Sequence, residues 1–269
     1  MTRPPPPSAM DPPRLFPKAT AVLIALNVGV WLLQVAAGVA PLLPPPAALI
    51  AWGGDLPLLT LTGDTWRLVT ALFLHGGVLH LGMNMAALAF TGTRAEDEFG
   101  TPRMLVVYLA GGVLAGAASI LWNERHVAAG DLSGLMTVSV GASGAIMALF
   151  GALLAALVLV PPRFAHLPAQ QRPQVDFRLV QLVAINVAVG FVVPHVDQAA
   201  HVGGLLAGMA LGGVMAALPA ATGGRAALAR HGVAALLVAV CIGALLHGAP
   251  RQQLQVLRAQ WSWQQAAVR

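Results

Sequence analysis

Seven apolar stretches, each without Lys, Arg, Asp or Glu in its interior, follow one another along the 269-residue chain. About 20 apolar residues are enough for a helix to cross the hydrocarbon core of a bilayer, so stretches of this kind limit the fold more than any other feature. They predict an all-α, polytopic membrane protein. The expected spans cover roughly residues 19–39, 78–94, 103–122, 141–161, 178–194, 199–218 and 232–246.

The composition excludes an ordinary soluble protein. Only 9% of the residues are charged and 57% are hydrophobic, whereas soluble proteins carry about 25% charged residues. The net charge of +5 does not indicate nucleic acid as a partner, because the basic residues are scattered between apolar segments instead of forming a stripe. Cys241 is the only cysteine, which excludes disulfides within the chain and thiolate metal sites.

Proline and charge divide the chain into four parts. Residues 1–18 are rich in proline and poor in apolar residues, which is typical of a disordered tail, here expected to be cytoplasmic. Residues 19–218 are the expected transmembrane core, and residues 219–248 hold a loop and the seventh span. Residues 249–269 form a C-terminal tail.

The distribution of Lys and Arg predicts the orientation. If the N-terminus is cytoplasmic, the inner segments hold most basic residues and the outer loops hold only Arg67 and Arg125. The C-terminal tail is the exception, since it is basic and would lie outside. Its Leu254, Leu257 and Trp261 recur at helical spacing and predict a short amphipathic helix on the membrane surface. One lysine beside fourteen arginines, with abundant Ala and Gly, points to a bacterial genome and hence to the inner membrane.

Polar side chains lie near the outer ends of three expected spans that run in the same direction. These are His80 in the second span, Ser143 in the fourth and His201 in the sixth. Polar groups at such depth mark a functional site by default. A neutral imidazole can remove the proton of a serine hydroxyl, and the positive end of a helix dipole favours developing negative charge. The sequence therefore predicts a hydrolytic site in a wet cavity open to the outer side.

Neighbouring residues complete this predicted site. His80 and Asn84 stand at i and i+4, share one helical face and can donate hydrogen bonds to an oxyanion. No carboxylate lies within a span, so a Ser–His dyad is favoured over a triad, and Asp197 is the only candidate third member. Small residues that allow close helix packing accompany the serine and the second histidine; they are Gly141, Gly144, Gly204 and Gly208.

Together these motifs resemble the rhomboid family of intramembrane serine proteases over about residues 19–218. The resemblance is carried by several pieces in the order of the chain: Trp66-Arg67, His80-Leu81-Gly82-Met83-Asn84, Glu96, Gly141-Ala142-Ser143-Gly144, and His201 with Gly204 and Gly208. It implies a six-helix rhomboid-like catalytic bundle with the seventh span as an addition. It also implies transmembrane-helix substrates within the lipid bilayer and no metal or cofactor.

The resemblance also implies individual roles. Ser143 would be the nucleophile, His201 the general base, and His80 with Asn84 the stabilisers of the oxyanion. Some members of the family have a tyrosine one turn after the serine that stacks on the catalytic histidine, and Met147 occupies that position here. Trp66 and Arg67 would anchor the first loop, and Glu96 would be a buried hydrogen-bonding anchor: the resemblance implies these roles too.

Other interpretations of the same residues stay open at this point. Serine and glycine occur in membrane helices simply to allow packing, and His80 with Asn84 could be an interhelical hydrogen-bonded pair. His75 is expected to be an interfacial histidine. A catalytically inactive relative that binds or chaperones membrane helices is the main alternative function. A transporter would show internal repeats and broken helices, and no repeat is evident.

Overall fold

The computed structural model describes residues 17–128, 132–159, 180–181, 183–188, 196–217, 224–248 and 251–267. Within these residues the chain is helical, as the apolar segments predict. The longer helices are α1 (Lys18–Ala36), α5 (Val78–Phe99), α6 (Thr101–Ala128), α7 (Ser143–Leu159), α9 (Gln198–Ala217), α10 (Gly224–Gly248) and α11 (Arg251–Ala267). The short ones are α2 (Pro46–Ala51), α3 (Pro57–Leu61), α4 (Arg67–Thr70), η1 (Ala71–Phe73) and η2 (Leu132–Met136).

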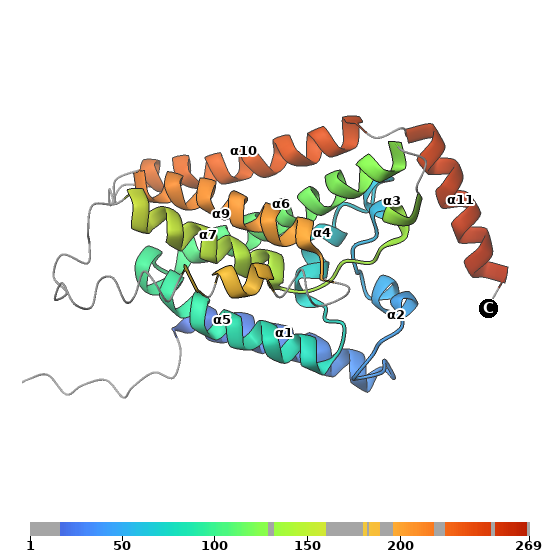
Figure 1. Cartoon of the computed structure of the whole chain (residues 1–269), viewed down its shortest axis with the longest axis horizontal. Helices are drawn as coiled ribbons and strands as arrows, with labels where there is room; N and C mark the ends of the chain where they lie inside the picture. The colour runs from blue at the N-terminus through green and yellow to red at the C-terminus, as the bar shows by residue number, and fades with distance from the viewer. Residues whose placement is uncertain are drawn as a thin grey trace, which may run out of the picture.

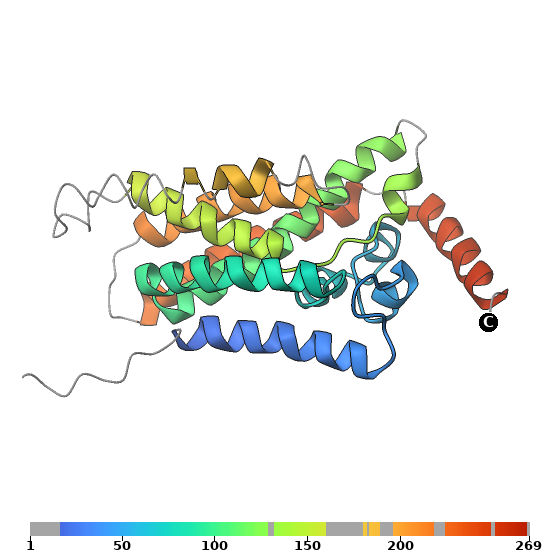
Figure 2. The same cartoon turned by 60° about the horizontal axis from the view of Figure 1, so that its bottom comes forward.

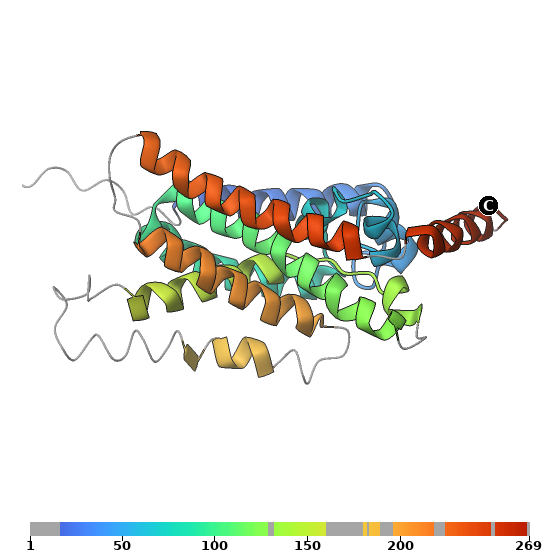
Figure 3. The same ribbon diagram turned by 90° about the horizontal axis from the view of Figure 1, so that it is seen from above.

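The short helices α2 to α4 gather with α11 at one end of the molecule (Figures 1 and 3). The other long helices lie side by side along the long axis: α1, α5, α6, α7, α9 and α10. Helices α5, α7 and α9 all begin toward that end and run opposite to α1, α6 and α10 (Figures 1 and 2). Helix α7 contacts α5, α6 and α9, and its residues 144–153 are all buried. The first turns of α5, α7 and α9 therefore point toward the same part of the molecule.

Three helical segments among the described residues are long and apolar enough to cross a membrane: Lys18–Ala36, Thr101–Glu124 and Gln198–Met215. Residues 67–73 and 78–99 form a fourth candidate if they are taken as one span, bent by 92°. Helices α7 and α10 hold only shorter apolar segments, so fewer spans meet the length criterion than the seven expected. The expected fifth span lies mostly outside the described residues.

Glu96 joins the end of α5 to the beginning of α1. Its carboxylate accepts hydrogen bonds from the backbone N–H groups of Ala19 and Thr20, at 3.1 and 3.0 Å. It also accepts one from the hydroxyl of Thr101, at 2.6 Å. The first N–H groups of a helix have no partner within the helix and carry partial positive charge, so a carboxylate there stabilises the helix end.

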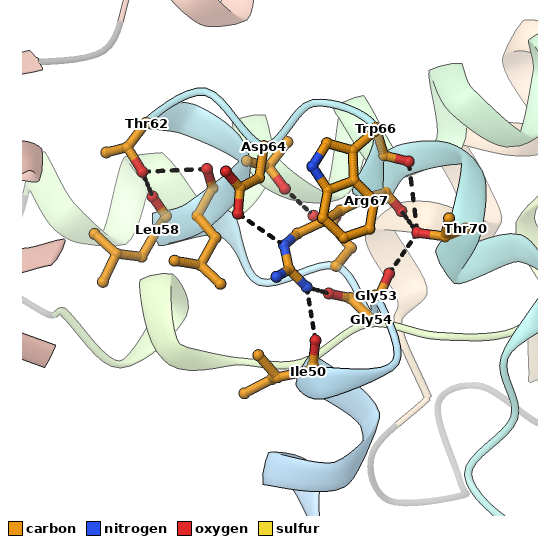
Figure 4. A network of polar contacts seen from close by, with 12 residues as sticks. Ile50, Gly53, Gly54, Leu58, Thr62, Asp64, Trp66, Arg67 and Thr70 are labelled. Atoms are coloured by element: carbon orange, nitrogen blue, oxygen red, sulfur yellow. Dashed lines mark hydrogen bonds and ion pairs between the residues drawn. The ribbon is translucent and has the colours of Figure 1, made fainter. Parts of the chain in front are cut away.

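Arg67 holds the loop between α1 and α5 together (Figure 4). Its Nη1 donates to the carbonyl oxygens of Ile50 and Gly54, at 2.8 and 2.9 Å. Its Nε lies 3.3 Å from a carboxylate oxygen of Asp64, and its guanidinium stacks 4.6 Å from the ring centre of Trp66. A planar guanidinium with five donors can satisfy several loop carbonyls at once, which explains why this irregular segment is ordered.

Helix α11 packs on this loop. Leu254 is 1% exposed and belongs to a buried cluster with residues of α3, which Leu257 and Trp261 also contact. Arg258 donates to the carbonyl of Thr62 at 3.1 Å. It also forms an ion pair with Asp64 at 3.0 Å. The amphipathic pattern thus does form a helix, and its apolar residues pack on the first loop. The spacing of apolar residues alone does not distinguish such a protein contact from a contact with lipid.

Candidate active site

Ser143 is the first residue of α7 and follows a tight turn at Gly141. Gly141 has φ +124°, a conformation that favours glycine. Its N–H donates to the carbonyl of Ala71 at 2.9 Å. A Cβ added at Gly141 would lie 2.9 Å from Nε2 of His80. The ring of His80 therefore occupies the space beside the turn, and glycine is required there by both conformation and contact.

The hydrogen bonding of His80 fixes which ring nitrogen can donate. Its Nδ1 accepts a hydrogen bond from the N–H of Gly76 at 3.1 Å. A neutral histidine that accepts at Nδ1 carries its proton on Nε2. This Nε2–H is thus a donor that faces Gly141, and Gly141 precedes Ser143 by two residues in the sequence.

Asn84 lies one turn further along α5. Its amide nitrogen donates to the carbonyl of His80 at 2.9 Å, and its Oδ1 is buried without a hydrogen-bond partner among the described residues. Two protons are available on the amide nitrogen, so one remains for another acceptor. Asn84 and His80 share the helix face that the i, i+4 spacing predicts.

Backbone contacts bring the helix of His201 against the helix of Ser143. A Cβ added at Gly204 would lie 2.3 Å from the carbonyl oxygen of Gly144, and one added at Gly208 would lie 1.9 Å from that of Ala148. Only glycine permits such an approach. Three of the four glycines predicted for helix packing, Gly144, Gly204 and Gly208, thus do lie at the contact between α7 and α9. The fourth, Gly141, lies against the ring of His80 instead.

The side chain of His201 is 8% exposed, and its Nδ1 is buried without a hydrogen-bond partner in the described part of the chain. No hydrogen bond joins Ser143 to His201 among the described residues. Catalytic hydrogen bonds are often long before substrate binds, so the absence of this one does not exclude proton transfer between the two side chains. Met147 is buried one turn after Ser143.

His75 differs from the expectation that it lies at the interface. It is 1% exposed, its ring centre lies 5.2 Å from that of His80, and neither ring nitrogen has a hydrogen-bond partner among the described residues. The chain bends sharply between His75 and α5 at Gly77, where φ is +114°. The spacing of five residues between His75 and His80 does not predict this contact, because the bend at Gly77 and not helical periodicity brings the two rings together.

The carboxylate of Asp197 has partners other than the ring of His201. It accepts hydrogen bonds from the hydroxyls of Ser119 and Ser139 and from the N–H of Ala200. No hydrogen bond joins this carboxylate to the ring of His201 among the described residues. Among the described residues there is no cluster of three or more His, Cys, Asp or Glu suited to hold a metal ion.

Asp55 is a buried carboxyl close to the same region. Its backbone pairs with Ser139 through N–H···O contacts of 3.1 and 2.8 Å, and its carboxyl accepts a hydrogen bond from Thr60. The pKa of Asp55 is raised from 3.8 to about 6, chiefly because the carboxyl is buried. The Thr60 hydroxyl and Arg67 lower this pKa, and the charge of Asp197 raises it.

Replacement of Asp55 with asparagine should flatten the pH dependence of stability. The folded protein holds the Asp55 proton more tightly than the unfolded chain, so in the wild type stability falls as pH rises from about 4 to about 6. The shift corresponds to roughly 3 kcal/mol at about 1.4 kcal/mol per pKa unit. Thermal unfolding in detergent between pH 4 and 7 should show a shallower fall for Asp55→Asn. The exposed Asp97→Asn is the control, and equal slopes in all three proteins would contradict the prediction.

Comparison with known proteins adds independent information. The family model described as Rhomboid domain matches residues 62–218. RHOMBOID-like protein 1 of Arabidopsis thaliana is 36% identical over 185 residues, which cover 66% of this chain and 42% of the relative. Rhomboid protease GluP of Bacillus subtilis (strain 168) is 31% identical over 200 residues, which cover 74% of this chain and 35% of the relative.

Rhomboid protease AarA of Providencia stuartii is 32% identical over 197 residues, which cover 70% of this chain and 69% of the relative. The match thus extends over most of that relative, but over less than half the length of the first two. The similarity includes the segments that carry His80, Ser143 and His201, since all three lie within residues 62–218.

Proposed function

Because the chain belongs to the rhomboid family, we propose that it is an intramembrane serine endopeptidase that uses Ser143 as nucleophile and His201 as general base. The observation that carries the proposal is the backbone contact between α7 and α9 at Gly204 and Gly208. This contact sets the first turns of the two helices against each other, and these turns hold the hydroxyl and the imidazole.

The proposed reaction proceeds through an acyl-enzyme. His201 takes the proton from Ser143 Oγ as this oxygen attacks the scissile carbonyl carbon, and returns it to the leaving amine as the C–N bond breaks. Water then attacks the ester carbon while His201 accepts a proton from it. His201 returns this proton to Ser143 Oγ as the ester C–O bond breaks, which releases the acid and the free serine. Each half-reaction restores the neutral imidazole, so the pair of groups suffices for turnover.

The oxyanion formed in each step would be stabilised by donors from two helices. His80 supplies Nε2–H, since its Nδ1 is already an acceptor, and Asn84 supplies the free amide proton. The backbone N–H of Ser143, at the start of α7, is the third donor. Donors fixed in advance around a developing charge in a site of low polarity are usually the largest contribution to catalysis.

The proposal extends to substrate and location. The substrates would be transmembrane helices of other proteins, cut in a water-accessible cavity open to the outer side of a bacterial inner membrane. The chain would have a cytoplasmic N-terminus, a six-helix catalytic bundle over residues 19–218 and a seventh span within residues 219–248. The tail expected over residues 1–18 lies almost entirely outside the described residues. Several helices that meet the criterion for a membrane span support this arrangement.

A serine-reactive probe separates this function from that of a non-catalytic helix-binding relative. Purified protein in detergent or liposomes should be labelled at Ser143 and should cleave at least one of a panel of single-span substrates. Absence of both labelling and cleavage in the wild type would refute the protease and support the binding protein.

Replacement of Asn84 with alanine should lower the cleavage rate moderately. Loss of one oxyanion donor is typically worth about 10²–10³ in rate, and the effect here should lie at or below the lower end because His80 and the Ser143 N–H remain. The measurement is kcat for one single-span substrate. Gln252→Ala, at an exposed position of α11, serves as control. A kcat for Asn84→Ala equal to that of the wild type would remove Asn84 from the site.

A further inference from the structure

A single carboxylate links the segment that precedes α7 to the helices α6 and α9. The hydroxyl of Ser139 donates to Oδ2 of Asp197 at 2.8 Å. The hydroxyl of Ser119, in the interior of α6, donates to the same oxygen at 2.5 Å. These three residues are separated by 20 to 78 positions in the sequence, so the contact is a tertiary one. Helices α6, α7 and α9 pack on one another.

The other oxygen of Asp197 caps the helix that carries His201. Oδ1 accepts a hydrogen bond from the N–H of Ala200 at 2.9 Å, and the carbonyl of Asp197 accepts one from the N–H of His201 at 3.0 Å. This is the arrangement of an N-cap, in which a short side chain satisfies a donor of the first turn. The position of Asp197 thus fixes where α9 begins.

Ser139 precedes Ser143 in the chain as Asp197 precedes His201. It lies four residues before the serine, just as Asp197 lies four residues before His201. Its backbone pairs with that of Asp55, and Gly141 is held to Ala71 by the hydrogen bond already described. The chain that enters α7 is therefore fixed on one side by the first loop and on the other side by Asp197.

We propose, on the premise that the chain is a serine protease, that Asp197 is a positioning residue for the reaction. By joining the N-cap of α9 to Ser139, it sets how far along the bundle axis His201 lies relative to Ser143, which is on a different helix. The carboxylate is suited to this because it only accepts hydrogen bonds when ionised and can take several at once. Since no hydrogen bond joins the Asp197 carboxylate to the ring of His201 among the described residues, Asp197 acts through the position of the helices and not as a hydrogen-bonding partner of the imidazole.

The consequence of losing this link is a change in alignment. A displacement of about 1 Å between reacting groups can cost about a hundredfold in rate. Ser119, Ser139 and Asp197, in contrast, are not among the residues proposed to contact the substrate. Loss of the link should therefore lower kcat and leave KM nearly unchanged.

Steady-state cleavage of a single-span substrate by the full chain tests this inference. Ser139→Ala removes the link and leaves the cap, and we expect kcat to fall about tenfold with KM within about twofold of the wild type. Asp197→Ala removes both, and we expect a fall of about a hundredfold. Asp197→Asn should recover part of the loss, because its amide oxygen can still accept the N–H of Ala200.

The double variant Asp197→Ala/Ser139→Ala should be no slower than Asp197→Ala, since both changes remove the same link. Thr137→Ala is the matched control, because the hydroxyl of Thr137 is exposed and bonds only locally, to the carbonyl of Ser133. If Asp197→Ala does not fold, Ser139→Ala alone carries the test.

A Ser139→Ala variant with the kcat of the wild type would overturn the inference, and so would a loss found entirely in KM or fully additive effects in the double variant. A wild type without any turnover would refute the protease itself. The two failures are therefore distinguishable.

Discussion

Replacement of Ser143 with alanine is expected to abolish both cleavage and labelling by a serine-reactive probe, and replacement of His201 with alanine is expected to abolish cleavage. In serine proteases, loss of the nucleophile or the base lowers kcat by about 10⁴–10⁶-fold. Neither change should unfold the protein, because Ser143 forms no hydrogen bond to His201 among the described residues and its side chain is small. The measurements are kcat with a single-span substrate and the midpoint of thermal unfolding in detergent.

Ser262→Ala is a matched control for the serine variant. Ser262 lies on α11, is exposed and donates only to the carbonyl of Ala259, so its loss should change neither cleavage nor labelling. Turnover by Ser143→Ala or by His201→Ala comparable to that of the wild type would refute the dyad. Loss of activity accompanied by a large fall in the unfolding midpoint would count against a purely chemical role.

Replacement of Gly208 with alanine should also lower kcat strongly, but by disturbing the packing of two helices instead of removing a reactive group. The new Cβ would lie 1.9 Å from the carbonyl oxygen of Ala148 and 2.5 Å from its Cα, which is backbone and cannot rotate away. Helices α7 and α9 must separate, and since overpacking a tight contact commonly costs about 1–3 kcal/mol, the unfolding midpoint should fall. Separation also withdraws His201 from Ser143, so kcat should fall by about a hundredfold or more.

Gly243→Ala provides the comparison. Gly243 lies in α10, and a Cβ added there meets nothing within 4 Å. The same chemical change should therefore be neutral or slightly stabilising, because alanine favours the helix more than glycine does by about 1 kcal/mol. Equal kcat values and equal unfolding midpoints for the Gly208 and Gly243 variants would show that the contact between α7 and α9 is looser than described.

The helical class and the candidate residues were predictable because both depend on local patterns. Uninterrupted apolar stretches leave a chain few alternatives to membrane helices. Ser143, His80 and His201 stand out because polar groups are rare in such helices. The glycines at 204 and 208 indicate a close helix contact by their spacing alone. The C-terminal helix shows the limit of this reasoning, since the sequence predicted its amphipathic pattern but not that its apolar face packs on the first loop.

What the sequence determined by itself is therefore the helical membrane class and the set of candidate side chains, because each follows from the composition of a short segment. The tertiary structure decided which partners those side chains meet. The burial of His75 beside His80 and the sharing of Asp197 between Ser119 and Ser139 depend on bends and contacts between residues far apart in the chain. Such contacts leave no periodic signal in a sequence, because they are fixed by how the helices pack and not by how each helix forms.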